Sequence, residues 1–145
     1  MRAVRLHGVG ELRVEEVASP GPPPAGYLRL AVKAAGICGS DLHNYRTGQW
    51  ISHLPVTPGH EFAATVAELG ADVGGFNPGD LVVADSRANC GTCFHCLEGN
   101  GNLCLAMGYV GEVSDGGFAE ETLLPADRVL RVPAGGHGAP RPKAR

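Results

Sequence analysis

The chain has 145 residues, enough for one domain with a modest hydrophobic core. Its 43% hydrophobic and 19% charged residues are typical of a globular protein, and a net charge of -3 argues against nucleic-acid binding, which needs a basic face. No apolar run reaches the roughly 18–20 residues of a membrane span, and the first residues lack the apolar core of a signal peptide. We therefore expect a cytoplasmic protein with no nucleic-acid or membrane partner.

Short runs of alternating apolar and polar residues predict half-buried strands. These runs surround Val4 and Leu6, Leu12 and Val14, Leu28 to Lys33, Val66 to Leu69, Phe118 to Leu124, and Val129 to Val132. The continuous apolar run 81–84 predicts a fully buried strand instead. Only residues 40–46 read as a short helix, with Asp41 in its first turn and an end near Gly48. Many short strands separated by Gly and Pro predict a mainly β fold, a barrel or a sandwich.

Two features of the sequence limit which domains it can encode. No Gly-x-Gly-x-x-Gly segment stands between a strand and a helix, and strands do not alternate with long helices. The sequence therefore predicts no nucleotide-binding sheet. Residues 134–145 carry no bulky apolar side chain, so we expect a domain over 1–133 followed by a disordered tail over 134–145.

Four of the five cysteines, Cys90, Cys93, Cys96 and Cys104, fall in the loop 89–107. Zinc takes four thiolates at tetrahedral corners, and Cys-x-x-Cys steps allow a tight turn to bring two sulfurs to one ion. The alternative is two disulfides in a secreted loop, which a cytoplasmic location disfavours. The cluster thus predicts a closed structural zinc site, with His95 facing solvent.

The leucines of this loop are its main aliphatic side chains. We expect Leu97, Leu103 and Leu105 to anchor the loop by packing.

The remaining cysteine, Cys38, precedes the triplet Gly59-His60-Glu61 by about twenty residues. A thiolate, an imidazole and a carboxylate are the ligand types of a catalytic zinc that keeps one position open. From the residues alone, a cysteine and a histidine this far apart are more often buried packing residues than metal ligands.

The sequence resembles the zinc-containing medium-chain dehydrogenases over residues 1 to about 133. Five motifs occur in that family's order: Cys38-Gly39-Ser40-Asp41-Leu42-His43, Gly59-His60-Glu61, Pro78-Gly79-Asp80, the four-cysteine loop, and Gly116-Gly117-Phe118-Ala119-Glu120. The resemblance implies a GroES-like β-barrel, the N-terminal domain of an alcohol or polyol dehydrogenase, with the family's Rossmann domain missing from this chain. It implies two zinc ions, one catalytic and one structural, and NAD or NADP in the full-length enzyme.

Roles for individual residues also follow from the resemblance. It implies Cys38 and His60 as catalytic zinc ligands and Glu61 as a direct or transient one. Ser40 and His43 match the groups that carry the substrate proton to solvent. Asp41 matches the carboxylate that orients the ligand histidine.

The resemblance also concerns the substrate and assembly. A small alcohol or polyol is the implied substrate, and full-length relatives are expected to be homo-oligomeric. Tyr45 and Trp50 follow the Cys38 motif in the chain and either line the substrate pocket or cover the barrel as exposed loop aromatics. The chain alone is expected to be inactive.

This sequence departs from the family pattern at several positions. Ala64 stands where the family usually has glycine. The family's further zinc ligand is unassigned, with Glu120 and Glu121 the nearest carboxylates, and residues 136–145 match nothing in the family.

Three other functions remain open from the sequence. A non-catalytic GroES-like zinc-binding module would use the cysteine loop for folding only. A redox sensor would need labile thiols, which zinc would mask. A zinc-free quinone reductase is disfavoured because such relatives lack the cysteine loop.

Overall fold

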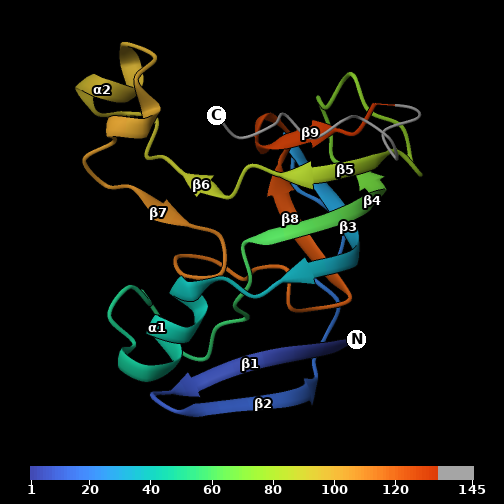
Figure 1. Cartoon of the computed structure of the whole chain (residues 1–145). Helices are drawn as coiled ribbons and strands as arrows, with labels where there is room; N and C mark the ends of the chain where they lie inside the picture. Colours follow the sequence, from blue (N-terminus) through green and yellow to red (C-terminus); the bar gives the residue numbers. More distant parts are fainter. Residues whose placement is uncertain (134–145) are drawn as a thin grey trace, which may run out of the picture.

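The computed structural model describes residues 1–133, and their secondary structure is mainly β, as predicted (Figure 1). The strands are β1 Arg2–Gly8, β2 Glu11–Glu16, β3 Tyr27–Gly36, β4 Glu61–Leu69, β5 Leu81–Ala84, β6 Arg87–Ala88, β7 Gly108–Tyr109, β8 Glu121–Pro125 and β9 Val129–Arg131. The helices are α1 Gly39–Thr47 and α2 Phe94–Leu97, with 3-10 turns η1 Gly101–Leu103 and η2 Ala126–Arg128. The predicted tail over 134–145 lies outside the described residues.

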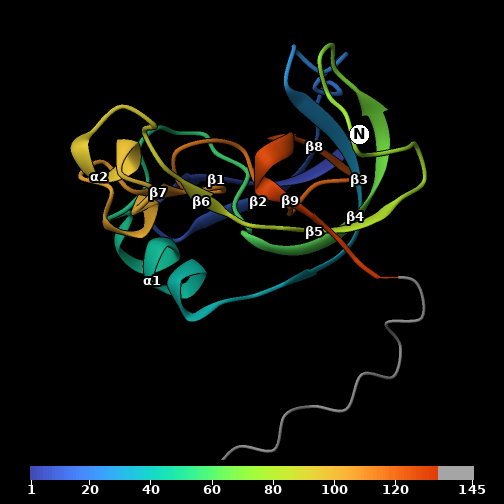
Figure 2. The same ribbon diagram turned by 90° about the horizontal axis from the view of Figure 1, so that it is seen from above.

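A curled antiparallel sheet in the order β8-β3-β4-β5-β9 forms the body of the fold. The hairpin β1-β2 lies beside it and is joined to later segments by bridges from Ala3 to Ala119 and from Leu6 to Val56. Both views place α1 and α2 at the same end of the sheet (Figures 1 and 2). Every pairing between these strands is antiparallel, which differs from the parallel sheet of a nucleotide-binding domain.

The core lies against the concave face of this sheet because alternate residues of each strand point to it. Its buried members are Leu28, Leu30, Phe62, Ala64, Val66, Val82, Val110, Leu124 and Val129. The prediction of a fully buried β5 is wrong. Val82 is completely buried, but Leu81 is 37% and Val83 36% exposed, because β5 turns only one face to the core.

Helix α1 begins directly after Cys38 and ends at Gly48, close to the predicted bounds. Gly48 adopts a left-handed conformation with φ of 65° and donates its N–H to the carbonyl of Asn44 at 2.8 Å. Asp41 lies in the first turn, where its carboxylate accepts the N–H of Cys38 at 2.8 Å and complements the positive end of the helix dipole.

The loop 89–107 forms a lobe whose base is closed by the short ribbon of β6 and β7 (Figure 1). The leucines predicted to anchor it do not do so: Leu97 is 73%, Leu103 54% and Leu105 79% exposed. The lobe is too small to have an interior of its own, so its aliphatic side chains remain at the surface. Its structure must therefore depend on other contacts. None of the described helices is long and apolar enough to cross a membrane.

Candidate metal centres

The four cysteines of the lobe converge on one point. Their sulfurs all lie within 4.8 Å of one another, with Cys90 Sγ 3.9 Å from Cys96 Sγ and 3.5 Å from Cys104 Sγ. A tetrahedron of zinc–sulfur bonds of about 2.3 Å has edges of ~3.8 Å. The donor set therefore fits a structural zinc ion. All five cysteines are free, and the separations exceed the ~2.05 Å of a disulfide bond.

Backbone amides around the lobe cysteines favour thiolates. Cys104 Sγ accepts the N–H of Cys90 at 3.3 Å and of Ala106 at 3.4 Å, and Cys90 Sγ accepts that of Cys93 at 3.4 Å. The N–H groups of Thr92 and Cys93 lower the pKa of Cys90 to about 6. Burial raises the pKa of Cys96 to about 12, so without a cation the four thiols do not ionise together. A zinc ion would supply the charge that deprotonates all four.

A second cluster brings together residues from two segments. One ligand atom each of Cys38, His60 and Glu61 lies within 4.8 Å of the other two. Cys38 precedes α1, whereas His60 directly precedes β4 and Glu61 is the first residue of that strand. The set matches a catalytic zinc site with three protein ligands and an open position. His95 belongs to neither cluster; its ring contacts that of Phe94, with centroids 5.5 Å apart.

The imidazole of His60 lies between a hydroxyl and a carboxylate. Ser40 Oγ is 3.3 Å from His60 Nε2, and Asp41 Oδ1 is 3.6 Å from His60 Nδ1. The side chains of His60 and Asp41 are each only 11% exposed. The Ser40 hydroxyl at Nε2 and the Asp41 carboxylate near Nδ1 flank the ring, and a carboxylate at one ring nitrogen is typical of histidines that ligate a metal through the other.

His43 lies farther out on α1. Its Nε2 is 2.8 Å from Gln49 Oε1, and its ring stacks on Trp50 with centroids 4.3 Å apart. The described residues show no hydrogen bond between Ser40 and His43. The structure thus places both predicted relay residues on α1 without joining them directly.

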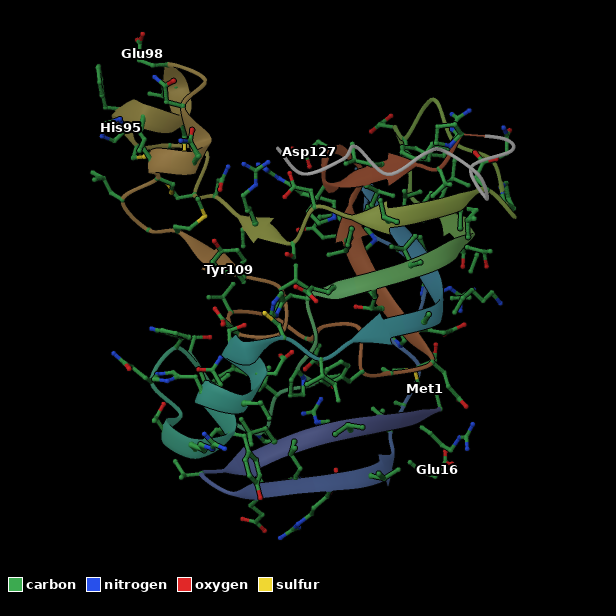
Figure 3. The ribbon with its side chains drawn as sticks, in the orientation of Figure 1. Met1, Glu16, His95, Glu98, Tyr109 and Asp127 are labelled. Atoms are coloured by element: carbon green, nitrogen blue, oxygen red, sulfur yellow. The ribbon has the colours of Figure 1, made fainter. Side chains whose placement is uncertain are left out.

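A cavity of about 720 Å³ opens beside the Cys38 cluster. It is lined by Cys38, Ser40, Trp50, His60, Glu61, Ser86, Met107, Gly108, Tyr109, Glu112 and Val113. Trp50 therefore lines the cavity, whereas Tyr45 does not. Tyr109 lies between the lobe and α1, its ring centroid 6.1 Å from that of His60 (Figure 3).

Glu112 also lines this cavity, although no sequence pattern predicted it there. Its side chain is buried, and its Oε1 accepts a hydrogen bond from Asn44 Nδ2 at 2.9 Å. Burial raises the pKa of Glu112, and the hydrogen bond from Asn44 opposes that rise. The flanking segment Gly111-Glu112-Val113-Ser114-Asp115-Gly116 reads as an exposed turn, so only the folded chain reveals the contact with Asn44.

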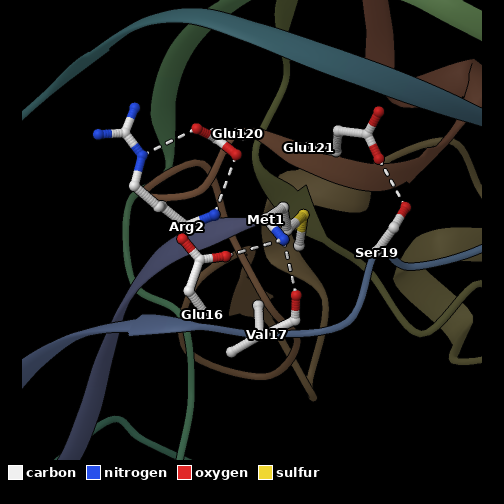
Figure 4. Close-up of polar contacts among 7 residues, drawn as sticks. All are labelled: Met1, Arg2, Glu16, Val17, Ser19, Glu120 and Glu121. Carbon is white, nitrogen blue, oxygen red and sulfur yellow. Dashed lines mark hydrogen bonds and ion pairs between the residues drawn. The ribbon is translucent and has the colours of Figure 1, made fainter.

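The two carboxylates left unassigned by the sequence lie elsewhere (Figure 4). Glu120 accepts the backbone N–H and the Nε–H of Arg2, at 2.9 and 3.0 Å, and these bonds lower its pKa. Glu121 accepts the hydroxyl of Ser19 at 2.7 Å and pairs with Arg29 at 3.5 Å. Neither belongs to the Cys38 cluster.

Comparison with known proteins decides the family. The family model described as the alcohol dehydrogenase GroES-like domain matches residues 24–134. The chain belongs to this family. The predicted GroES-like fold and the resemblance to zinc-dependent medium-chain dehydrogenases are thereby confirmed.

Individual relatives span a longer length than this chain. This chain is 39% identical to the sorbitol dehydrogenase of Halalkalibacterium halodurans over 131 residues, which cover 89% of this chain and 37% of that protein. A crystal structure of an alcohol dehydrogenase from Escherichia coli in complex with NADH is 35% identical, with a TM-score of 0.83, over 92% of this chain and 39% of the other. A cobalt- and zinc-bound thermostable alcohol dehydrogenase from Pyrobaculum aerophilum is 36% identical, with a TM-score of 0.81, over 92% of this chain and 42% of the other.

Proposed function

We propose that this chain is the zinc-binding catalytic domain of a zinc-dependent NAD(P) alcohol or polyol dehydrogenase. The observation that carries the proposal is the convergence of Cys38, His60 and Glu61 in the wall of the 720 Å³ cavity. Relatives named for polyol substrates, such as sorbitol and D-altritol dehydrogenases, support the substrate class.

Cys38, His60 and Glu61 would hold the catalytic zinc, while Cys90, Cys93, Cys96 and Cys104 would hold the structural one. A zinc ion in the first site supplies a Lewis acid that lowers the pKa of an alcohol hydroxyl. Asp41 fixes the orientation of the His60 ring, and the N–H of Cys38 in turn holds Asp41.

The proton from the substrate hydroxyl would leave along α1. Ser40 Oγ, which lines the cavity, accepts it and releases its own hydroxyl proton. Since no hydrogen bond joins Ser40 to His43 directly, a bridging water or ligand hydroxyl carries a proton on to His43, which delivers it to the surface beside the exposed Gln49. Trp50 covers His43 and provides an apolar wall for the carbon skeleton. We propose NAD or NADP as hydride acceptor, held by residues outside the antiparallel domain of residues 1–133. The cytoplasmic location and the homo-oligomeric full-length form remain predictions from sequence.

Cobalt substitution tests the proposal, because the visible bands of Co²⁺ respond to a change in its ligands. Adding 2-butanol to the cobalt-loaded chain should alter these bands, since a catalytic site keeps a position open. The change should disappear in Cys38→Ser and persist in Cys93→Ser. A non-catalytic zinc module has only the closed four-thiolate site, so unchanged bands in the wild-type chain would refute the dehydrogenase proposal.

A further inference from the structure

Glu112 is a buried carboxyl group in the wall of the metal-site cavity. Only 7% of the residue is exposed, and no salt bridge in residues 1–133 includes it. Placing a carboxyl group out of water with one neutral hydrogen bond is costly. A glutamine could make the same bond to Asn44 without that cost, so packing alone does not account for a glutamate here.

The surroundings fix the position of this carboxyl group. Asn44 donates to Oε1, and the side-chain oxygen Oδ1 of Asn44 accepts the N–H of Trp50 at 3.2 Å. The backbone carbonyl of Glu112 accepts two hydrogen bonds from Ser52, one from its backbone N–H at 3.0 Å and one from its side-chain hydroxyl at 3.1 Å. Side chain and backbone are thus both held, which orients the carboxyl group before any ligand arrives.

The second carboxyl oxygen of Glu112, Oε2, has no hydrogen-bond partner within residues 1–133. It is also not one of the fully buried polar atoms that lack a partner there, so part of it remains accessible. Because Glu112 lines the cavity, this oxygen can meet a molecule bound there. Glu112 is also separate from the residues whose ligand atoms cluster within 4.8 Å of one another, so its role differs from that of Cys38, His60 and Glu61.

We propose that Glu112 binds a second hydroxyl of the substrate and thereby selects polyols over monohydric alcohols. A polyol offers one hydroxyl to the catalytic site and others along its chain, and the cavity lies within the ~300–1,000 Å³ typical of small-molecule sites. A site built to hydrogen-bond a hydroxyl discriminates strongly against an analogue that lacks it. The inference rests on the proposed function, because it assumes that an alcohol occupies the cavity.

The chain itself supplies a binding signal that does not depend on turnover. Trp50 is its single tryptophan and lines the same cavity, so its fluorescence should report a bound ligand. We would titrate the zinc-loaded chain with 2,3-butanediol and with 2-butanol, which differ by one hydroxyl. The wild-type chain should bind the diol about tenfold more tightly, as expected for one added hydrogen bond that 2-butanol cannot make.

The variant Glu112→Gln tests the residue directly. It keeps the volume and the bond from Asn44, so it should fold, and thermal unfolding would check this. Diol affinity should fall to within about threefold of that for 2-butanol, while 2-butanol affinity stays unchanged. Glu98→Gln, at the far end of the lobe, is the matched control and should keep the full preference (Figure 3).

The outcomes separate this inference from the proposed function. Equal binding of both alcohols by the wild-type chain, or an unchanged preference in Glu112→Gln, would overturn the role of Glu112 alone. Equal losses of diol and monohydric affinity in the variant would also overturn it, since they indicate a general structural effect. If neither alcohol changes Trp50 fluorescence, the proposed function fails and this inference fails with it.

Discussion

Gly59, the residue before His60, packs directly against the ring of Phe118. The φ of Gly59 is 93°, and a Cβ placed there would lie within 2.8 Å of Phe118 Cγ and Cε1. The glycine therefore serves two needs, a left-handed backbone and close approach to a ring. Its neighbours His60 and Glu61 are both members of the candidate catalytic cluster.

Gly59→Ala should therefore destabilise the domain and weaken metal binding at Cys38 and His60. Gly75→Ala is the matched control, because Gly75 has a φ of 82° but a Cβ added there would meet nothing within 4 Å. The control should cost roughly 1–2 kcal/mol of unfolding free energy, and Gly59→Ala about 1–3 kcal/mol more. Urea denaturation of both variants measures the difference. Equal losses would show that the Phe118 contact does not matter.

Chelators should remove the two metal ions in a fixed order. The Cys38 cluster offers three ligands within residues 1–133, one of them the exposed Glu61, whereas the lobe offers four thiolates supported by amide donors. A mild chelator should therefore release zinc in two phases, monitored with a colorimetric zinc indicator. Cys38→Ser should eliminate the faster phase only. Release in a single phase from the wild-type chain would contradict this order.

The metal-free lobe should react unevenly with iodoacetamide. A pH of 7 is above the pKa of Cys90, about 6, so Cys90 is mainly thiolate. The same pH is far below the pKa of Cys96, about 12, so Cys96 remains a thiol. Only the thiolate attacks, so Cys90 should be alkylated first, and its rate should fall as pH drops below about 6. Peptide mapping by mass spectrometry follows each site. Bound zinc should protect both, and faster labelling of Cys96 would contradict the assignment.

The chain of 145 residues alone should not oxidise alcohols. Hydride transfer requires the nicotinamide to be held against the substrate carbon, and such positioning accounts for roughly 7–11 kcal/mol of barrier lowering. Zinc-loaded chain incubated with butanediol, sorbitol or threonine and either NAD or NADP should give no reduced nicotinamide above a Cys38→Ser control. Turnover above that control would mean that these residues contain an unrecognised cofactor site.

Local patterns predicted much of the fold because parts of its long strands alternate between apolar and polar residues. The run from Leu28 to Val32 matches part of β3, and Gly48 ended α1 as expected of a left-handed cap. The strands β6 and β7 have two residues each, too short for any period to be visible. The burial of β5 was misjudged because a continuous apolar run does not show which face the core covers.

The residues of the candidate sites likewise fall into those that local sequence predicted and those that it could not. Cys90, Cys93, Cys96 and Cys104 are close in sequence, so their spacing alone predicted one cluster. The meeting of Cys38 with His60 depends on how α1 packs beside the start of β4, and there the family resemblance supplied what spacing could not. Glu112 was missed because its partner Asn44 is 68 residues away, and no local pattern marks that contact.

The number of zinc ions per chain is the sharpest test of whether the domain holds two independent metal sites. Elemental analysis of the purified chain should give about two zinc ions, with about one in Cys38→Ser and about one in Cys93→Ser. The zinc retained by Cys38→Ser should resist mild chelation, and that retained by Cys93→Ser should not. One zinc ion in the wild-type chain, unchanged by Cys38→Ser, would contradict the catalytic site and leave only the structural one.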